Sequence, residues 1–248
     1  MKPGGRGRIL FWPGGSLWIG RAEGSTGLHS HHAVQLTFAL PGSHVRFREP
    51  QGEWQAYAAA IVPTHQVHAM DAPGEEVELV FAEPESHDGR AIHLRYRGGV
   101  SPLASVPADA LFAEYRRGGS DAALVACARR VIAALAGEAA SAAAPLDSRI
   151  ARAIELLRLR LDETVKLSEI AGAVHLSPDR FRHLFLEQTG VRFRPYVLWQ
   201  RVELAVAEYA SGATLTQAAQ AGGFADSAHF SRTFRRMFGL PAAAIRIE

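Results

Sequence analysis

Apolar and polar positions alternate through the first part of the chain with the period of two that is typical of β-strands. Val34–Phe38 is a short apolar run, and Val45 and Phe47 alternate with arginines on a second run. In residues 77–81, the side chains of Val77, Leu79 and Phe81 share one face. Glycine and proline interrupt these runs at short intervals, from about residue 15 to residue 84. This pattern predicts antiparallel sheets arranged as a sandwich or a barrel.

The period of the apolar positions changes after Pro107. Residues 110–115 and 124–135 are rich in alanine and carry apolar side chains at helical spacing, so they are expected to form helices. Residues 137–147 are small and weakly polar with one proline, which is typical of a linker. From Ile150 to Phe238 the pattern is helical throughout.

The helical half contains an internal repeat. Residues 167–171 match residues 215–219 at an offset of 48, and Phe181 and Phe185 match Phe230 and Phe234 at an offset of 49. Each copy predicts a short helix, a turn, and a second helix with a polar outer face, which is the pattern of a helix-turn-helix. A helix from about residue 195 to residue 209 is expected to join the two copies.

The expected helix ends follow from single residues. Ser177-Pro178 suits the start of the second helix of the first copy, and Thr189-Gly190 suits its end. Gly222-Gly223 supplies the turn of the second copy, whereas His175 stands at the equivalent turn position of the first copy. Histidine tolerates the left-handed backbone region better than most residues do, so the turn is still expected there.

Composition and charge narrow the class of protein. The net charge is +2, and residues 147–248 hold 14 Lys and Arg against 11 Asp and Glu, a local excess of +3. Cys127 is the single cysteine, which excludes an intramolecular disulfide and a thiolate metal cluster, and we expect a buried, inert thiol. No apolar run approaches the roughly 18 residues of a membrane span, and no secretory signal is readable. We therefore expect a cytoplasmic protein.

Charged outer faces also occur on ordinary helical bundles, but the duplication of a capped unit with arginine on both second helices favours DNA binding. Residues 148–246 resemble the DNA-binding domain of the AraC/XylS family of transcription regulators. The resemblance covers Ser168–Ala171, Ser177, Phe181, Phe185, Thr189-Gly190, Arg201 with Ala205, Gly223-Phe224, Phe230–Arg232, Phe234, Phe238-Gly239 and Arg246. Pro241 departs from the family pattern, because it follows Gly239 after two residues instead of three.

The resemblance implies two recognition helices that enter adjacent major-groove segments about 34 Å apart. By position, the implied base-reading residues are Asp179, Arg182, His183, Ser227, Ala228, His229 and Arg232. The implied phosphate contacts are Arg192, Arg194, Arg235 and Arg236. Arg182 and Arg232 suit bidentate contacts to guanine, and Asp179 either accepts from cytosine or caps its own helix. Arg201 is open to two interpretations, a phosphate contact or a structural ion pair.

Histidine is abundant in the first half of the chain. The segment with Gly24, His29, His31 and Gln35 resembles the first cupin motif, in which two histidines and a glutamate bind a metal, and His68 after Pro63 resembles the second motif. The resemblance implies a divalent metal such as Zn, Mn or Fe. Gln35 replaces the glutamate with a neutral, weaker ligand, so the alternative is a cupin-like pocket without metal that still binds a small molecule. The remaining histidines of this region are expected at the surface or around the site, namely His32, His44 and His65.

The sequence therefore predicts an α+β protein of two domains, a cupin-like β-barrel with helices and an all-α double helix-turn-helix. The expected boundaries are 1–106 for the effector-sensing domain, 107–136 for dimerisation helices, 137–147 for the linker and 148–248 for the DNA-binding domain. The expected partners are double-stranded promoter DNA, a small-molecule or metal effector, a second copy of the chain and RNA polymerase.

The apolar residues of the dimerisation helices are expected to form a two-fold seam or to pack on their own barrel, namely Leu111, Leu124, Val125, Val131, Ile132 and Leu135. Two rival functions stay open at this point. One is a metal-dependent cupin enzyme tethered to DNA, and the other is a constitutive DNA-binding repressor with a vestigial barrel. No Ser/His/Asp or paired-carboxylate constellation indicates catalysis, so we expect a protein that is not an enzyme.

Overall fold

The computed structural model describes residues 3–103, 109–137 and 139–248. The chain divides into two compact units. The first unit consists of Met1–Ala143 together with Ser231–Glu248, and the second unit consists of Ala144–Phe230. The first unit is thus built from two separate stretches of the chain. The domain boundaries expected from the sequence stay a prediction.

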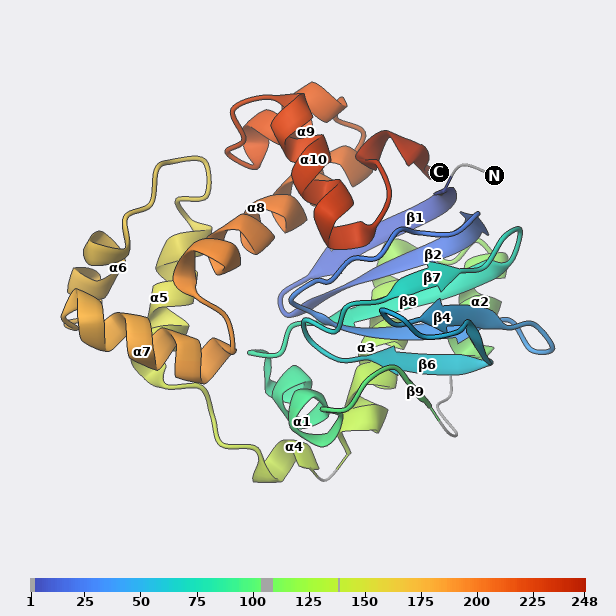
Figure 1. Ribbon diagram of the computed structural model, residues 1–248, viewed down its shortest axis with the longest axis horizontal. Coiled ribbons are helices and arrows are strands. Elements are labelled where there is room, and N and C mark those ends of the chain that lie inside the picture. The colour runs from blue at the N-terminus through green and yellow to red at the C-terminus, as the bar shows by residue number, and fades with distance from the viewer. Residues whose placement is uncertain (1–2, 104–108, 138) are drawn as a thin grey trace. The chain divides into compact units, whose positions relative to one another are not determined.

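The first unit contains two sheets (Figure 1). The larger sheet has the strand order β10 (Ile245–Ile247), β1 (Gly4–Trp12), β2 (Gly15–Glu23), β8 (Glu76–Ala82), β3 (Val34–Ala39), β6 (Ala59–Val62) and β9 (Ser101–Pro102). The smaller sheet has the order β5 (Gln55–Tyr57), β4 (Val45–Arg48) and β7 (Ala69–Asp71). Neighbouring strands are antiparallel except β1 and β10, which pair in parallel with Gly5 opposite Ile245.

The sequence-based expectation of strands is confirmed, with one correction to the architecture. The two sheets are not joined by a ladder among the described residues, so the unit is not a closed barrel. Apolar side chains of both sheets, including Phe47, Val62 and Met70, form a common core cluster. Because side chains alternate along a strand, Val77, Leu79 and Phe81 of β8 face away from Val80 and Ala82.

Helices pack against the other face of the large sheet (Figure 1). They are α1 (His87–Arg95), α2 (Asp109–Arg116), α3 (Asp121–Ala136) and the short α4 (Ala139–Ala142). The residues expected as a possible dimer seam lie in this packing, except Val125, which is half-buried. Leu111, Leu124 and Leu135 are buried in the same cluster as Leu17 and Val80 of the sheet. These side chains therefore pack on their own sheet, and dimerisation stays a prediction that needs another surface.

The second unit consists of helices. They are α5 (Ser148–Arg158), α6 (Leu167–Ala173), α7 (Pro178–Thr189), α8 (Phe193–Ala210) and α9 (Leu215–Ala221). Helix α10 (Ser227–Phe238) runs from the second unit into the first and is followed by the 3₁₀ turn Ala242–Ala244. Aromatic and aliphatic side chains of α5 to α8 form one core cluster, including Ile154, Phe181, Phe185 and Tyr196.

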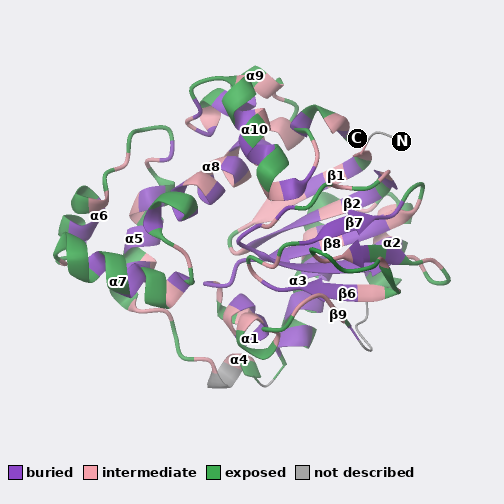
Figure 2. Ribbon diagram, viewed as in Figure 1, coloured by how far each residue is buried: buried purple, intermediate pink, exposed green. Residues whose placement is uncertain are grey.

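Burial follows the amphipathic pattern of the elements (Figure 2). Leu17, Val34 and Val80 are fully buried in the sheet, and Ile150 and Leu157 are fully buried on one side of α5. Exposed positions on the helices lie between such buried ones, as an apolar stripe of helical period requires. Among the described helices, none combines the length and the hydropathy that a membrane span needs.

Candidate functional site

The first helix-turn-helix is formed by α6 and α7. His175 lies in the turn with φ of 57°, the left-handed value that the sequence led us to expect there. The Ser177 hydroxyl accepts a hydrogen bond from the Arg180 backbone N–H and so caps α7. Gly190 ends the same helix with φ of 71°. Both ends of the predicted recognition helix are thus confirmed.

The second helix-turn-helix is formed by α9 and α10. Thr214 and Gln217 make a reciprocal capping box at the start of α9. Gly223 supplies the turn with φ of 68°, and a Cβ there would lie 2.3 Å from the Leu161 carbonyl oxygen. At the start of α10 the Asp226 carboxylate accepts from the His229 backbone N–H at 2.6 Å. Asp226 therefore caps α10.

The outer faces of α7 and α10 hold most of the residues expected to contact DNA. In α7, Asp179, Arg182 and His183 are exposed on the side opposite the buried Phe181 and Phe185. In α10 the exposed residues are Ala228, His229, Arg232, Arg235 and Arg236, while Ser227 is half-buried. Arg192 and Arg194 are exposed at the start of α8. Each predicted side chain is therefore accessible, and its contact with DNA stays a prediction.

Asp179 and Arg182 form an ion pair at 2.6 Å on the surface of α7. The backbone carbonyl of Asp179 also accepts from His183 Nδ1 at 2.8 Å. The Ser177 hydroxyl, not the Asp179 carboxylate, makes the side-chain cap of this helix. Asp179 thus holds the guanidinium that is expected to read guanine, and an exposed pair of this kind is weak enough to open on binding.

Arg201 is a structural residue in this unit. Its Nε donates to the Leu161 carbonyl at 2.9 Å, and its terminal nitrogen donates to the Glu163 carbonyl at 2.6 Å. Both acceptors lie in the loop between α5 and α6, so Arg201 fastens α8 to that loop. The partners are backbone carbonyls instead of the side-chain carboxylate that an ion pair would need.

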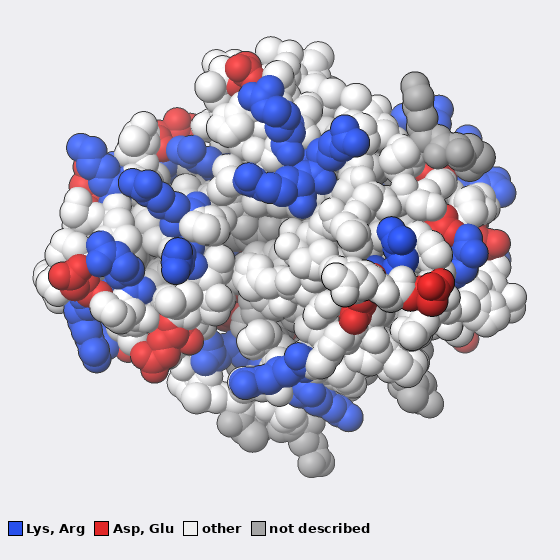
Figure 3. Space-filling model, in the orientation of Figure 1, with Lys and Arg blue, Asp and Glu red and all other residues white. Residues whose placement is uncertain are grey.

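Lysine and arginine side chains are prominent over the helices of the second unit (Figure 3). This agrees with the excess of 14 Lys and Arg over 11 Asp and Glu in residues 147–248. The excess is small, so a general attraction to the phosphate backbone is modest, and recognition must depend on placed side chains.

Three of the predicted histidines come together in the first unit. The ring nitrogens of His29, His31 and His68 that could act as ligands lie within 4.8 Å of one another, and all three residues are buried. Two backbone hydrogen bonds of 2.9 Å between His29 and His68 hold the two loops together. We call these three residues the histidine trio.

Backbone carbonyls set the orientation of each ring of the trio. His29 Nδ1 donates to the Gly27 carbonyl, His31 Nδ1 to the Ala33 carbonyl and His68 Nδ1 to the Gln66 carbonyl, at 2.8 to 2.9 Å. A neutral imidazole that donates from Nδ1 carries a lone pair on Nε2. Burial lowers the pKa of His29 to about 4 and that of His31 to about 3, so the rings are neutral at pH 7. The neutral rings of His29 and His68 therefore carry Nε2 lone pairs that suit a ligand atom, while His31 Nε2 is in contact with the Gln35 side chain.

Gln35 lies beside the trio, as the sequence predicted. Its Oε1 is 2.9 Å from His31 Nε2, and its amide nitrogen donates to the Thr37 hydroxyl at 2.8 Å. His68 Nε2 is buried without a hydrogen-bond partner among the described residues. An orphaned buried imidazole nitrogen is unfavourable unless it acts as a ligand atom.

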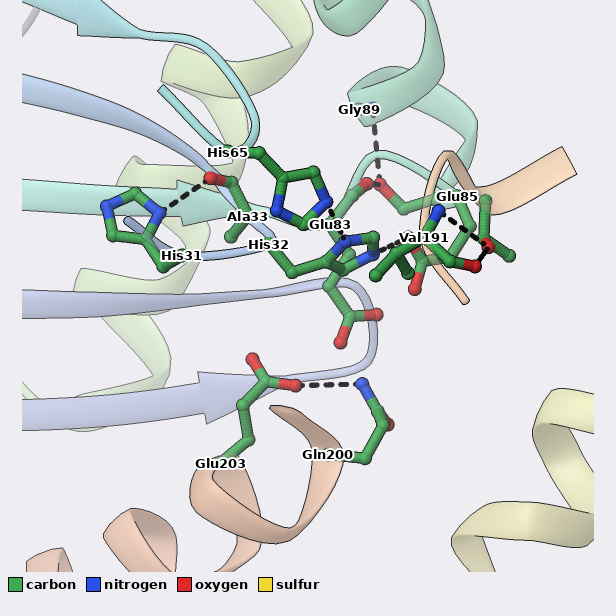
Figure 4. Close-up of polar contacts among 12 residues, drawn as sticks. His31, His32, Ala33, His65, Glu83, Glu85, Gly89, Val191, Gln200 and Glu203 are labelled. Atoms are coloured by element: carbon green, nitrogen blue, oxygen red, sulfur yellow. Dashed lines mark hydrogen bonds and ion pairs between the residues drawn. The ribbon is translucent and has the colours of Figure 1, made fainter. Parts of the chain in front are cut away.

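A second set of histidines lies next to the trio and was expected only as surface or surrounding residues (Figure 4). His32 Nε2 is 2.8 Å from a Glu85 carboxylate oxygen, and His32 Nδ1 is 3.3 Å from His65 Nε2. His32 and Glu85 are buried. Burial lowers the pKa of His65 to about 4, with the neighbouring His32 adding to the effect. His44 is exposed, as expected.

A pocket opens beside the trio within the first unit. Its lining includes the apolar residues Trp18, Leu79 and Phe81. The polar residues of the lining are Arg6, Arg8, Arg21, Thr26, His29 and Gln35. The pocket encloses about 800 Å³ when the open solvent at its mouth is included. A large part of its lining is apolar and the rest includes three arginines, so it suits a ligand with an apolar body and a polar or anionic group.

Two glycines face each other across β1 and β2 in the wall of this pocket. Gly7 pairs with Gly20 in the ladder. A Cβ on Gly7 would lie 2.1 Å from the Ile19 carbonyl oxygen, so no other residue fits this close approach.

Comparisons with known proteins agree with the helix-turn-helix. A family model described as a helix-turn-helix domain matches residues 170–247. The probable transcriptional regulator LumQ of Photobacterium leiognathi is 34% identical over 83 residues, which cover 32% of this chain and 33% of LumQ. The regulatory protein PocR of Salmonella typhimurium is 28% identical over 103 residues, covering 41% of this chain and 34% of PocR. The chain thus matches about a third of the length of these curated relatives.

Solved structures extend the likeness to the whole fold. ToxT from Vibrio cholerae aligns with a TM-score of 0.60 at 13% identity and covers 94% of this chain and 96% of its own. A second ToxT structure, described as bound to an unsaturated fatty acid, aligns with a TM-score of 0.54 at 10% identity over 92% of this chain and 91% of its own. The arrangement of a sheet-rich unit followed by helices is therefore that of ToxT. With the duplicated motif, its capped helices and the regulators that match it, residues 170–247 form a helix-turn-helix domain similar to those of transcriptional regulators.

Proposed function

We propose that this chain is a cytoplasmic, sequence-specific transcriptional regulator whose first unit binds a small effector that modulates promoter binding. The observation that carries the proposal is the pair of capped helix-turn-helix units, each with an exposed arginine on its second helix. Arg182 and Arg232 are the candidates for bidentate contacts to guanine. Dimerisation and contact with RNA polymerase, which the family resemblance implies, are part of the proposal.

The test of DNA recognition uses the full chain and duplexes selected from a random pool. Two recognition helices on one DNA face should enrich a bipartite site, with protected segments centred about 10 base pairs, or 34 Å, apart. Footprinting of the selected duplex measures that spacing. A pool that yields no enriched sequence would contradict sequence-specific recognition.

The effector proposed for the first unit has an apolar body and one polar end. Its support is the pocket, whose lining is largely apolar, with Trp18, Leu79 and Phe81, and also includes His29 and Gln35. The fatty-acid-bound ToxT structure supports a pocket ligand of this general kind in a protein of the same fold. Since the two chains are only 10% identical, the identity of the effector does not carry over.

The histidine trio fits a divalent metal. The ligand nitrogens of the three histidines lie within 4.8 Å of one another, and their Nδ1 atoms are fixed by backbone carbonyls. His68 Nε2 is buried without another partner among the described residues. His29, His31 and His68 would hold the metal, and the Gln35 amide oxygen lies next to them. A site of three nitrogens and no carboxylate favours zinc over manganese. Such a metal would act as a Lewis acid that binds the polar end of an effector.

Metal content of protein purified without an affinity tag or chelator tests the trio. We expect about one equivalent of metal per chain, lost in the H31A/H68A double variant. The H44A variant is the matched control, because His44 is an exposed histidine of the same unit. Protein that stays free of metal after dialysis against zinc or manganese would contradict a metal site at the trio, and the pocket would then bind organic ligands alone.

A further inference from the structure

The C-terminal stretch Ser231–Glu248 belongs to the first unit, although it follows the second unit in the chain. Strand β10 pairs with β1, so that Ile245 lies opposite Gly5. Arg246 donates to both carboxylate oxygens of Glu23 at 2.8 and 3.0 Å. The Gly27 backbone N–H donates to the Gly239 carbonyl at 2.8 Å. Backbone and side-chain bonds thus fix this stretch on the sheet edge.

The same stretch forms one wall of the effector pocket. Phe238, Leu240 and Ile245 line the pocket together with residues of the sheet. The Phe238 ring stacks on Trp18 with centroids 4.9 Å apart and meets Phe81 edge-on at 6.1 Å. These three residues are separated by more than 150 positions from the other walls, so the pocket is complete only when the C-terminal stretch is in place.

Gly239 lies directly against the loop that carries His29 and His31. A Cβ on Gly239 would lie 2.4 Å from the Gly27 carbonyl oxygen and 2.6 Å from His29 Nδ1, and its φ is 72°. The Phe238 ring also stacks on His31 with centroids 6.1 Å apart. The C-terminal stretch therefore contacts both the apolar lining of the pocket and the histidines His29 and His31.

We propose that Phe238, Leu240 and Ile245 are effector-contacting residues, and that an apolar effector is sensed directly by the helix that carries Arg232. This inference rests on the proposed function, because it assigns one wall of the proposed effector site. Phe238 is the last residue of α10, and Arg232 lies less than two turns earlier on that helix. An effector that fills the pocket gains contact with the C-terminal wall and so stabilises its docked position. The position of α10 then depends on pocket occupancy.

The test uses the full chain and the apolar fluorescent probe 1-anilinonaphthalene-8-sulfonate. Three tryptophan variants are compared by fluorescence titration. L79W fills the pocket from the sheet, L240W fills it from the C-terminal stretch, and I247W adds the same bulk to β10 at a half-buried position outside the lining. We expect L79W and L240W each to weaken the affinity for the probe by about tenfold or more. The I247W variant should change this affinity by less than about twofold.

The outcomes separate the two proposals. If L79W weakens the affinity for the probe and L240W does not, the probe binds in the pocket, but the proposed contact with the C-terminal stretch is overturned. If L79W and L240W both leave the affinity unchanged, the probe binds elsewhere, and both the pocket and its wall are overturned. Circular dichroism and binding to the selected duplex check that each variant is folded.

Hydrogen exchange supplies a second, independent readout on the unaltered protein. The backbone N–H groups of residues 245–247 should gain protection when the probe is bound, because occupancy stabilises the pairing of β10 with β1. Protection in the middle strands β3 and β8 serves as the internal reference. Unchanged exchange in β10 at saturating probe would overturn the proposed coupling.

Discussion

Glu78 is a buried acid in the middle of β8. Its side chain has no solvent exposure, and neither carboxyl oxygen has a hydrogen-bond partner among the described residues. Burial raises the pKa of Glu78 to about 9, and Asp109 on α2 adds to the increase. The carboxyl group is therefore protonated at neutral pH in the folded chain.

This raised pKa predicts that the free energy of unfolding falls as the pH rises from about 4.5 to about 9. Over that range the unfolded chain has lost the Glu78 proton while the folded chain retains it, so deprotonation favours unfolding. The contribution is fully present below pH 4.5 and is lost as the pH passes through the folded pKa. Urea unfolding between pH 5 and pH 9 measures this dependence.

The E78Q variant should flatten that dependence, because glutamine does not titrate. Over the same range the wild-type slope attributable to Glu78 is at most about 1.4 kcal/mol per pH unit. E76Q is the control, since Glu76 is two residues away on the same strand and pairs with Arg116 at the surface. Equal slopes in the wild type and E78Q would contradict the assignment.

Single arginines should account for base recognition by α7 and α10. R182A and R232A are each expected to cost about 1–3 kcal/mol in binding to the selected duplex and to relax specificity at one position. R235A should instead weaken binding uniformly across sequences and reduce the salt slope by about 1, as a phosphate contact does. An R232A variant that binds the duplex as tightly as the wild type would refute the assignment of the second recognition helix.

At the scale of elements, the contact of Arg201 with the loop between α5 and α6 predicts a stability effect. R201A removes two hydrogen bonds to backbone carbonyls, and we expect the free energy of unfolding to fall by about 1–3 kcal/mol. R194A is the matched control, because Arg194 is exposed on the same helix. If R201A unfolds like R194A and loses DNA affinity instead, Arg201 is a phosphate contact.

The sequence predicted the helix-turn-helix elements closely, because their ends depend on local chemistry. Ser177 and Gly190 mark the two ends of α7, and the expected helix from about 195 to 209 is α8, Phe193–Ala210. Local rules of capping and left-handed turns are sufficient there. The internal repeat then predicted the second helix-turn-helix from the first.

Other elements escaped prediction for identifiable reasons. Strand β1 begins with a glycine- and arginine-rich segment of low strand propensity, and it forms because β2 and β10 pair with it on both sides. Helix α1 has a polar sequence with a weak apolar stripe, and its visible start signal is the Ser86 cap. Helix α4 lies inside the segment expected to be a linker. In these places tertiary partners outweigh local propensity.

At the scale of the whole molecule, the motif spacing predicted His29, His31, Gln35 and His68 as one site, and the structure brings them together. The C-terminal wall of the pocket was beyond sequence reasoning. Its contacts join residues more than 200 positions apart, such as Arg246 and Glu23. The local periodicity of apolar positions does not predict contacts at such a separation. The paired His32 and Glu85, 53 positions apart, were missed for the same reason.

Sensing through α10 predicts reciprocal linkage between the pocket and DNA. The factor by which 1-anilinonaphthalene-8-sulfonate changes the Kd for the selected duplex should equal the factor by which the duplex changes the Kd for the probe. We expect a several-fold factor in the wild type and in I247W, measured by anisotropy and by probe fluorescence. A factor of one in both directions would mean that occupancy of the pocket does not affect DNA binding by the recognition helices.

The parallel pairing of β10 with β1 also affects the order in which the chain can fold during synthesis. Strand β10 is made about 160 residues after β8, which at roughly 5–20 residues per second takes on the order of 8–30 seconds. Throughout that interval β1 is an open sheet edge, and the pocket lacks one wall. Open edges are sites of aggregation. The nascent chain therefore passes through a period in which the edge of β1 and the apolar lining of the pocket are accessible to other chains.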